Sequence, residues 1–144
     1  MTKPTLRPRL VVADGVKAID FYRAALDAEE LVRYAEPSGA IVHAELKIGD
    51  DVFSLTQEEG VHNISPDTLG GSPMLLTLEV DDADQAGAAM EAAGATVVIP
   101  IDDRYYGNRE GRLRDPFGHL WIISQRNDDL STDEIQRRID AETD

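Results

Sequence analysis

Two halves of the chain match each other when the sequence is shifted by 68 residues. The shift lays one short pattern on another: Leu10, Val12 and Asp14 on Leu78, Val80 and Asp82. The same shift pairs residues 52–57 with residues 120–125, far downstream. Because one offset serves both ends of each half, the sequence predicts two copies of a strand–helix–strands module. Two copies are too few for a solenoid, so we expect them to pack as a pair.

Local patterns give each half one helix and several strands. Helical periodicity predicts helices over Val16–Leu26 and Ala83–Ala93, with Asp14 and Asp82 as N-caps. Strand patterns surround the helices, at Leu10–Val12, Ile41–Ile48, Val52–Gln57, Met74–Val80, Thr96–Ile99 and Leu120–Gln125. The Gly70–Pro73 segment predicts a linker between a first module, residues 1–69, and a second module, residues 74–126.

Period-2 alternation separates the two faces of each predicted strand. One face is strongly apolar, and it includes Val42 in the first half and Trp121 in the second. The opposite face mixes polar groups with apolar ones, and its polar members are His43, Glu45, Ser54, Thr56 and Thr77. A sheet packs its helices on an apolar face, whereas a mixed face is typical of a ligand pocket.

A loop rich in tyrosine and arginine lies beside this mixed face. We expect three of its side chains, Tyr105, Tyr106 and Arg109, to cover a ligand. Tyrosine and arginine offer flat, amphipathic contact to a planar molecule. The alternative is that the loop packs on itself and that one of its arginines, Arg104 or Arg109, forms a surface ion pair with Glu110.

Composition limits the possible partners and the cellular location. The chain has 28 acidic and 14 basic residues, a formal net charge of −14, which argues against binding to nucleic acid. It has no cysteine and no apolar run near the roughly 18 residues of a membrane helix. We therefore expect a cytoplasmic protein that contacts no membrane. The acidic tail, residues 127–144, has capping-box spacing at Ser131 and Glu134, which predicts a short helix docked on the body or on a partner subunit.

Several segments resemble the vicinal-oxygen-chelate superfamily, which includes glyoxalase I and bleomycin-resistance proteins. They are Val12–Asp14 with Ala18–Tyr22, and His43–Asp50. Tyr106–Gly111, Arg114–His119 and the tail resemble the branch of that superfamily named after a phosphonate operon. The resemblance implies an α+β fold of two paired βαβββ modules. These would form a cupped, mostly antiparallel mixed sheet with helices on the outer face, usually in a homodimer.

Superfamily members that do chemistry hold a divalent metal through His, Glu or Gln. The resemblance carries the four ligand positions onto Arg7, Ser54, Leu75 and Ile122. None of the four offers the imidazole or carboxylate that such an ion needs. We therefore expect no metal and no cofactor. The favoured function is metal-independent binding of a small organic ligand, aromatic or cationic, as in antibiotic sequestration and antibiotic resistance.

Two other functions stay open. His43 and Glu45 are two residues apart on one strand face, so they could form an acid–base pair or hold a displaced metal. The chain would then be a lyase, an isomerase or a dioxygenase-like enzyme. The third alternative is a dimeric scaffold with no small ligand. Of the other histidines, His119 is assigned to a turn and His62 to an exposed loop.

Overall fold

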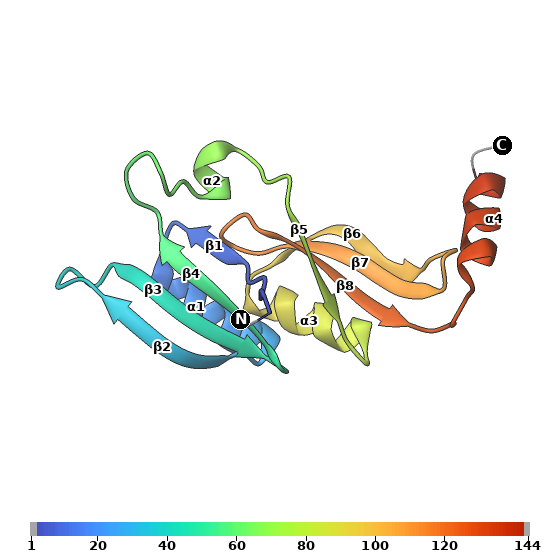
Figure 1. The fold of residues 1–144 in the computed structure, drawn as a ribbon, viewed down its shortest axis with the longest axis horizontal. Coiled ribbons are helices and arrows are strands. Elements are labelled where there is room, and N and C mark those ends of the chain that lie inside the picture. The colour runs from blue at the N-terminus through green and yellow to red at the C-terminus, as the bar shows by residue number, and fades with distance from the viewer. Residues whose placement is uncertain (1–2, 143–144) are drawn as a thin grey trace.

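The computed structural model describes residues 3–142, which form eight strands and four helices (Figure 1). In chain order they are β1 (Arg9–Val12), α1 (Gly15–Leu26), β2 (Glu29–Ala35), β3 (Ile41–Ile48), β4 (Asp51–Gln57), α2 (Pro66–Leu69), β5 (Leu75–Glu79), α3 (Ala83–Ala93), β6 (Thr96–Asp103), β7 (Asn108–Arg114), β8 (Leu120–Arg126) and α4 (Thr132–Glu142). The Gly70–Pro73 segment lies between α2 and β5.

Each half of the chain forms its own four-stranded sheet. The strand orders are β1-β4-β3-β2 and β5-β8-β7-β6. In each sheet the first two strands are parallel and the other pairs are antiparallel. Arg9 pairs with Ser54 in the first sheet, and Thr77 pairs with Ile122 at the repeat-related place in the second. The predicted α+β fold of two βαβββ modules with mixed sheets is confirmed, and the two sheets do not close into one.

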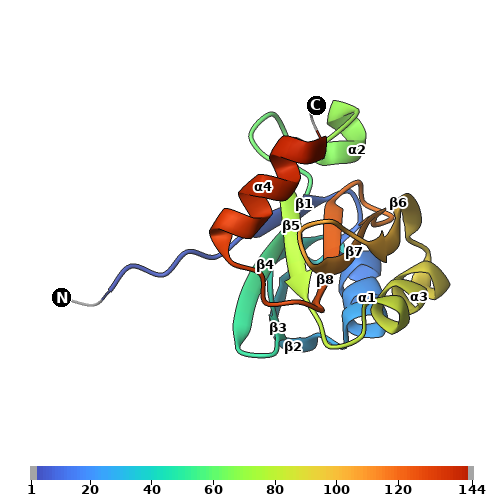
Figure 2. The same cartoon turned by 90° about the vertical axis from the view of Figure 1, so that its right-hand side faces the viewer.

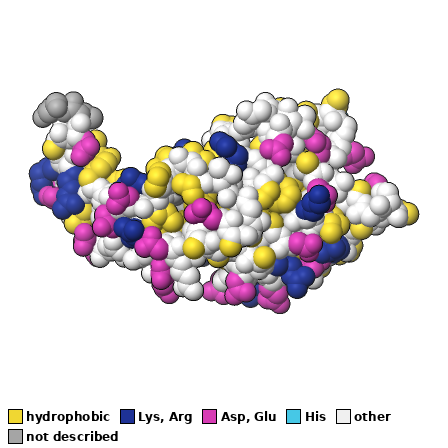
Figure 3. Space-filling model, turned by 180° about the vertical axis from the view of Figure 1, so that it is seen from behind, with side chains coloured by type: hydrophobic (Ala, Val, Ile, Leu, Met, Phe, Trp, Pro, Cys, Tyr) yellow, Lys and Arg dark blue, Asp and Glu magenta, His cyan; other side chains and the backbone are white. Residues whose placement is uncertain are grey.

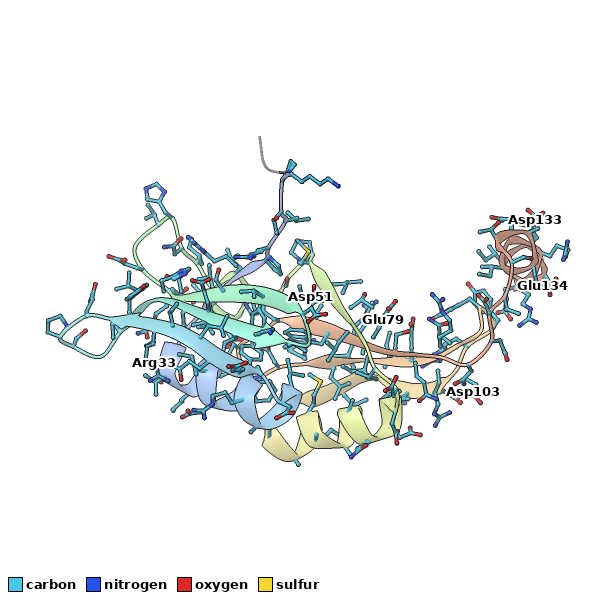
Figure 4. All side chains as sticks on the ribbon, turned by 60° about the horizontal axis from the view of Figure 1, so that its bottom comes forward. Arg33, Asp51, Glu79, Asp103, Asp133 and Glu134 are labelled. Carbon is cyan, nitrogen blue, oxygen red and sulfur yellow. The ribbon has the colours of Figure 1, made fainter. Side chains whose placement is uncertain are left out.

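Helices α1 and α3 pack against each other along one side of the molecule, with the sheets above them (Figure 4). Helix α1 packs on β3 and β4, and α3 packs on β6, β7 and β8. The sheet faces turned away from these helices are called the open faces. The first open face carries Arg9, Tyr34, His43, Glu45 and Ser54, and the second carries Leu75, Thr77, Ile99, Glu110, Arg112 and Ile122.

One hydrophobic core joins the two modules. The ring of Tyr22 on α1 is fully buried and contacts Phe53 of the first sheet and Trp121 of the second. Its hydroxyl donates to the buried carboxylate of Asp115, in the turn between β7 and β8. From the same turn, Nε2 of His119 donates to the carbonyl oxygen of Val11 in β1, at 2.8 Å. The core position predicted for Trp121 and the turn position predicted for His119 are both confirmed.

The structure corrects the predicted position of Val42. Val42 is 52% exposed, whereas Ile41 is buried. The reason is a register shift: Tyr34 pairs with His43 and Ala35 pairs with Ile41, so Val42 has no partner on β2. Such a bulge moves every residue before it to the other face. The alternation pattern also failed to predict β2 and β7. These strands contain several charged residues, so their few apolar positions do not form a recognisable pattern.

The tail helix lies where the capping-box spacing predicted it. The hydroxyl of Ser131 accepts from the backbone N–H of Glu134 at 3.1 Å. The carboxylate of Glu134 binds Arg137 and Arg138 instead of closing the box. Helix α4 projects from the end of the second module and has no buried residue (Figures 1 and 2).

Candidate functional site

The first open face brings an aromatic stack next to a carboxylate. Nε2 of His43 lies 3.4 Å from Oε2 of Glu45. The ring of Tyr34, across the strand pair, stacks on His43 with an interplanar angle of 17° and centroids 6.2 Å apart. Tyr34 is 59% exposed, so the stack offers a flat surface to solvent. Sequence reasoning missed Tyr34 because it missed β2.

Ser54 and Thr56 lie on the same face, but only the hydroxyl of Ser54 is accessible to a ligand. Ser54 pairs with Glu45 on one side, and its hydroxyl accepts from Nε of Arg9 at 3.3 Å on the other. Thr56 is buried, and its hydroxyl donates to the carbonyl oxygen of Val42 at 2.8 Å. His43, Glu45 and Ser54 therefore form the accessible polar group of this face, while Thr56 supports the strand.

The second open face contains a small hollow of about 250 Å³ beside Tyr106. The hydroxyl of Tyr106 donates to the carboxylate of Glu110. Burial, followed by this hydrogen bond, raises the pKa of Tyr106 to about 12. Arg104 donates from Nε to the carbonyl oxygen of Glu110 at 3.0 Å, so the loop is bound to β7 at two points. Tyr106 therefore stays protonated and fixed at neutral pH.

Tyr105 and Arg109 differ from Tyr106 in their surroundings. Tyr105 is exposed and packs edge-on against Tyr106, with centroids 5.0 Å apart. Arg109 makes two hydrogen bonds to Asp84 of α3, at 3.0 and 3.1 Å, and one to Asp103 at 3.1 Å. These bonds raise the pKa of Arg109 above its usual range. Arg109 thus points to the helix side of the sheet, and its ion-pair partners are these aspartates rather than Glu110.

The expected site residues fall into two groups at opposite ends of the long axis. The strands with His43, Glu45 and Ser54 lie at the β2 end, and the loop with Tyr105 and Tyr106 lies between β6 and β7 near α4 (Figure 1). A hollow of about 320 Å³ lies between the modules, lined by residues 5–8, the start of β4 and part of β5, including Thr77. One chain does not bring the two groups together.

The residues at the four expected metal positions do not fit a divalent ion. Ser54 has Arg9 as its hydrogen-bonding neighbour, and Ile122 has Thr77 as its cross-strand neighbour. Within residues 3–142, no three side chains of His, Cys, Asp or Glu gather closely enough to hold a metal. Near Ser54, Leu75 and Ile122 the side chains offer a guanidinium, hydroxyls, aliphatic groups and one carboxylate, that of Glu45 beside Ser54, which is too small a set of ligands for a divalent metal.

Acidic side chains gather along the lower edge of the molecule in Figure 3, in keeping with the net charge of −14. Among the described residues, no helix is both long and apolar enough to span a bilayer.

Comparison with known proteins finds relatives along nearly the whole chain. The family model described as the Glyoxalase/Bleomycin resistance protein/Dioxygenase superfamily matches residues 5–123. A protein of Mycobacterium bovis, named "Uncharacterized protein Mb0911c", is 39% identical over 146 residues, which cover 99% of this chain and 96% of that protein.

Solved structures show the same fold. TioX from Micromonospora sp. ML1 is 25% identical with a TM-score of 0.67, over 86% of this chain and 99% of that chain. The fosfomycin resistance protein FosX from Mesorhizobium loti is 18% identical with a TM-score of 0.62, over 85% of this chain and 91% of that chain. The family model matches at the level of the superfamily, and the phosphonate-operon branch stays a prediction.

Proposed function

Because the chain belongs to the glyoxalase/bleomycin resistance protein/dioxygenase superfamily, we propose that it binds a small organic molecule on its open faces without a metal ion. The observation that carries this proposal is the chemistry at the expected metal positions. Arg7 offers a guanidinium, Ser54 a hydroxyl, and the other two positions offer aliphatic groups. The remaining surface mixes polar and aromatic groups, as small-molecule sites do.

A second copy of the chain would complete the site. Both open faces of one chain are turned away from α1 and α3, so they do not enclose a ligand between them. A two-fold dimer could set the first open face of one copy against the second open face of the other, and it would form two equivalent sites. Two features support this pairing: Leu6, on the segment that extends away from the sheets, is 98% exposed (Figure 2), and Leu75 and Ile99 are exposed on the second open face.

In this dimer the ligand meets polar groups from one copy and tyrosines from the other. His43, Glu45 and Ser54 orient it, and Tyr105 and Tyr106 cover it. Thr77 lies at the edge of the site, near the hollow between the modules. Arg109 is left out because Asp84 and Asp103 hold it on the helix side, and Thr56 is left out because its hydroxyl binds the backbone.

The proposed ligand is aromatic, because two tyrosine-containing surfaces are available to stack on it. A cationic group on the ligand would pair with Glu45. The superfamily description includes bleomycin resistance proteins, and the structurally similar FosX is a fosfomycin resistance protein. Antibiotics and aromatic metabolites are therefore the first compounds to test.

The test is a thermal-shift screen of the full chain in the presence of EDTA. A ligand at 100 times its Kd stabilises a protein by about 2.7 kcal/mol, which is readily measured. We expect hits that persist in EDTA and weaken in Tyr34→Ala, Tyr106→Ala and Glu45→Gln. Lys17→Ala, an exposed change on α1, is the control and should bind as the parent does. Hits that need added metal, or that stabilise all the site variants equally, would refute the proposal.

The His43–Glu45 pair favours a second candidate, a metal-independent enzyme that uses these groups for proton transfer. Mass spectrometry of each hit after incubation separates the two candidates. Recovery of the intact compound supports binding alone. Conversion that is lost in His43→Gln, while affinity is kept, would establish the enzyme instead.

A further inference from the structure

Arg112 is a charged side chain without a partner in the described part of the chain. It lies in the middle of β7 on the second open face, between Ile122 of β8 and Ile99 of β6. Its Nε is buried and makes no hydrogen bond, and within residues 3–142 its guanidinium forms no ion pair. Leaving a buried donor unsatisfied costs free energy, so such a group calls for an explanation.

The charged groups nearest to Arg112 on this face are bonded to other residues. The closest carboxylate along its own strand face is that of Glu110, which accepts the hydroxyl of Tyr106. Arg104 uses its own guanidinium to bind the carbonyl oxygens of Glu110 and Pro100. These side chains all border the hollow of about 250 Å³ on the second open face. Two guanidinium groups and one carboxylate leave this hollow with an excess of positive charge, in a chain whose net charge is −14.

The hollow has an apolar part as well as a charged one. Ile99 and Ile122 border it next to Arg112 and offer contact to a ring or to methylene groups. Its volume is just below the roughly 300 Å³ at which pockets for drug-sized ligands begin. A single planar group therefore suits the hollow better than a large polycyclic one.

We propose that Arg112 anchors an anionic group, a carboxylate or a similar oxyanion, on a ligand whose planar part lies against Ile99 and Ile122. A guanidinium matches a carboxylate through two parallel N–H donors, and such pairs are strong when partly shielded from water. The inference rests on the proposed function, which it deepens by naming the chemical class of the ligand at this end of the site. It assigns an anion to Arg112, in addition to the cationic group that would pair with Glu45.

Three probes of one shape test the inference: benzoate, benzamide and benzamidine carry charges of −1, 0 and +1 on the same ring. Each is titrated into the isotope-labelled full chain and followed by NMR. We expect benzoate to shift the signals of Arg112 and Ile122 and to bind about tenfold or more tightly than benzamide. Benzamidine should leave these signals in place.

A matched pair of variants assigns the effect to one side chain. Arg112→Gln should weaken benzoate binding by about tenfold or more. Arg112→Lys keeps the charge but not the two-donor fork, so its benzoate affinity should lie between those of the parent and Arg112→Gln. The control is Arg114→Gln, because Arg114 lies two residues along the same strand, is exposed and should not alter binding. If Arg112→Gln does not fold, the role of Arg112 is tested by the benzoate affinity of Arg112→Lys and by the three probes on the parent protein.

Several results would overturn the inference. One is benzoate binding that is absent in the parent or unchanged in Arg112→Gln. Another is an equal response of the Arg112 signals to benzamidine. A third is loss of self-association in Arg112→Gln with unchanged benzoate affinity, because Arg112 would then pair with a carboxylate of a second copy. Hits from the EDTA screen would leave the proposed function standing in each case, whereas no hit in that screen would count against the proposed function itself.

Discussion

The hydroxyl of Tyr22 ties the first module to the second, and Tyr22→Phe removes it with little change in shape. The hydroxyl donates to Oδ2 of Asp115 at 2.5 Å, and both residues are buried. The same carboxylate accepts from Nε1 of Trp121 at 2.9 Å and from the backbone N–H groups of Phe117 and His119, at 2.9 and 3.0 Å. The substitution therefore removes one of four hydrogen bonds to a buried charge and keeps the ring contacts.

The size of the effect follows from the type of bond. A hydrogen bond to a charged acceptor contributes about 1.5–3 kcal/mol, and the retained ring means that no cavity is added. We expect the free energy of unfolding to fall by that amount, with a loss of about 3–12 °C in Tm for a chain of this size. Urea unfolding at pH 7 measures this loss of stability, and we expect the m-value to be unchanged. The control is Tyr105→Phe, an exposed tyrosine, which should change stability by less than about 0.5 kcal/mol.

The buried hydroxyl of Tyr22 also makes the stability of the protein depend on pH. Burial first, and then the charge of Asp115, raises the pKa of Tyr22 well above the ordinary value of 10.0. The folded state therefore holds this proton more tightly than the unfolded state. The resulting stability is present below pH 10 and is lost as the pH rises further. The difference between the parent and Tyr22→Phe should shrink above pH 10. A change below 0.5 kcal/mol at pH 7, or a difference that grows above pH 10, would refute the reasoning.

Two further predictions concern packing and the tail. Gly111→Ala should lower the free energy of unfolding by about 1–3 kcal/mol, because its Cβ would lie 2.7 Å from backbone atoms of Ile99 and Ile101. Chemical denaturation measures this, and parent-like stability would contradict it. Deletion of residues 131–144 should leave the body folded, because no residue of α4 is buried, and should weaken self-association if α4 contacts a second copy. Sedimentation identical to that of the parent would exclude that contact.

The candidate site could be predicted only where it depends on local pattern. Alternation along one strand was enough to predict that His43 and Glu45 share a face, and in the structure Nε2 of His43 lies 3.4 Å from Oε2 of Glu45. The same alternation failed at Val42, because the pairing of a neighbouring strand introduced a bulge. Tyr34 was missed because its strand lies at the edge of a sheet, where few positions are buried enough to show an apolar pattern.

The sequence by itself determined the repeat, the helix caps and the buried face of those strands whose alternation is regular, since each depends on residues close together in the chain. Asp14 accepts from the N–H of Lys17, and Asp82 accepts from that of Gln85, at the two ends that the repeat predicts. The tertiary structure decided which side chains meet across the modules and on the open faces, because the partners of these side chains are distant in sequence. Tyr22 meets its acceptor 93 residues away. Arg109, near the start of β7, reaches an aspartate of α3, and Arg112 lies between Ile99 of β6 and Ile122 of β8, which offer it no polar partner.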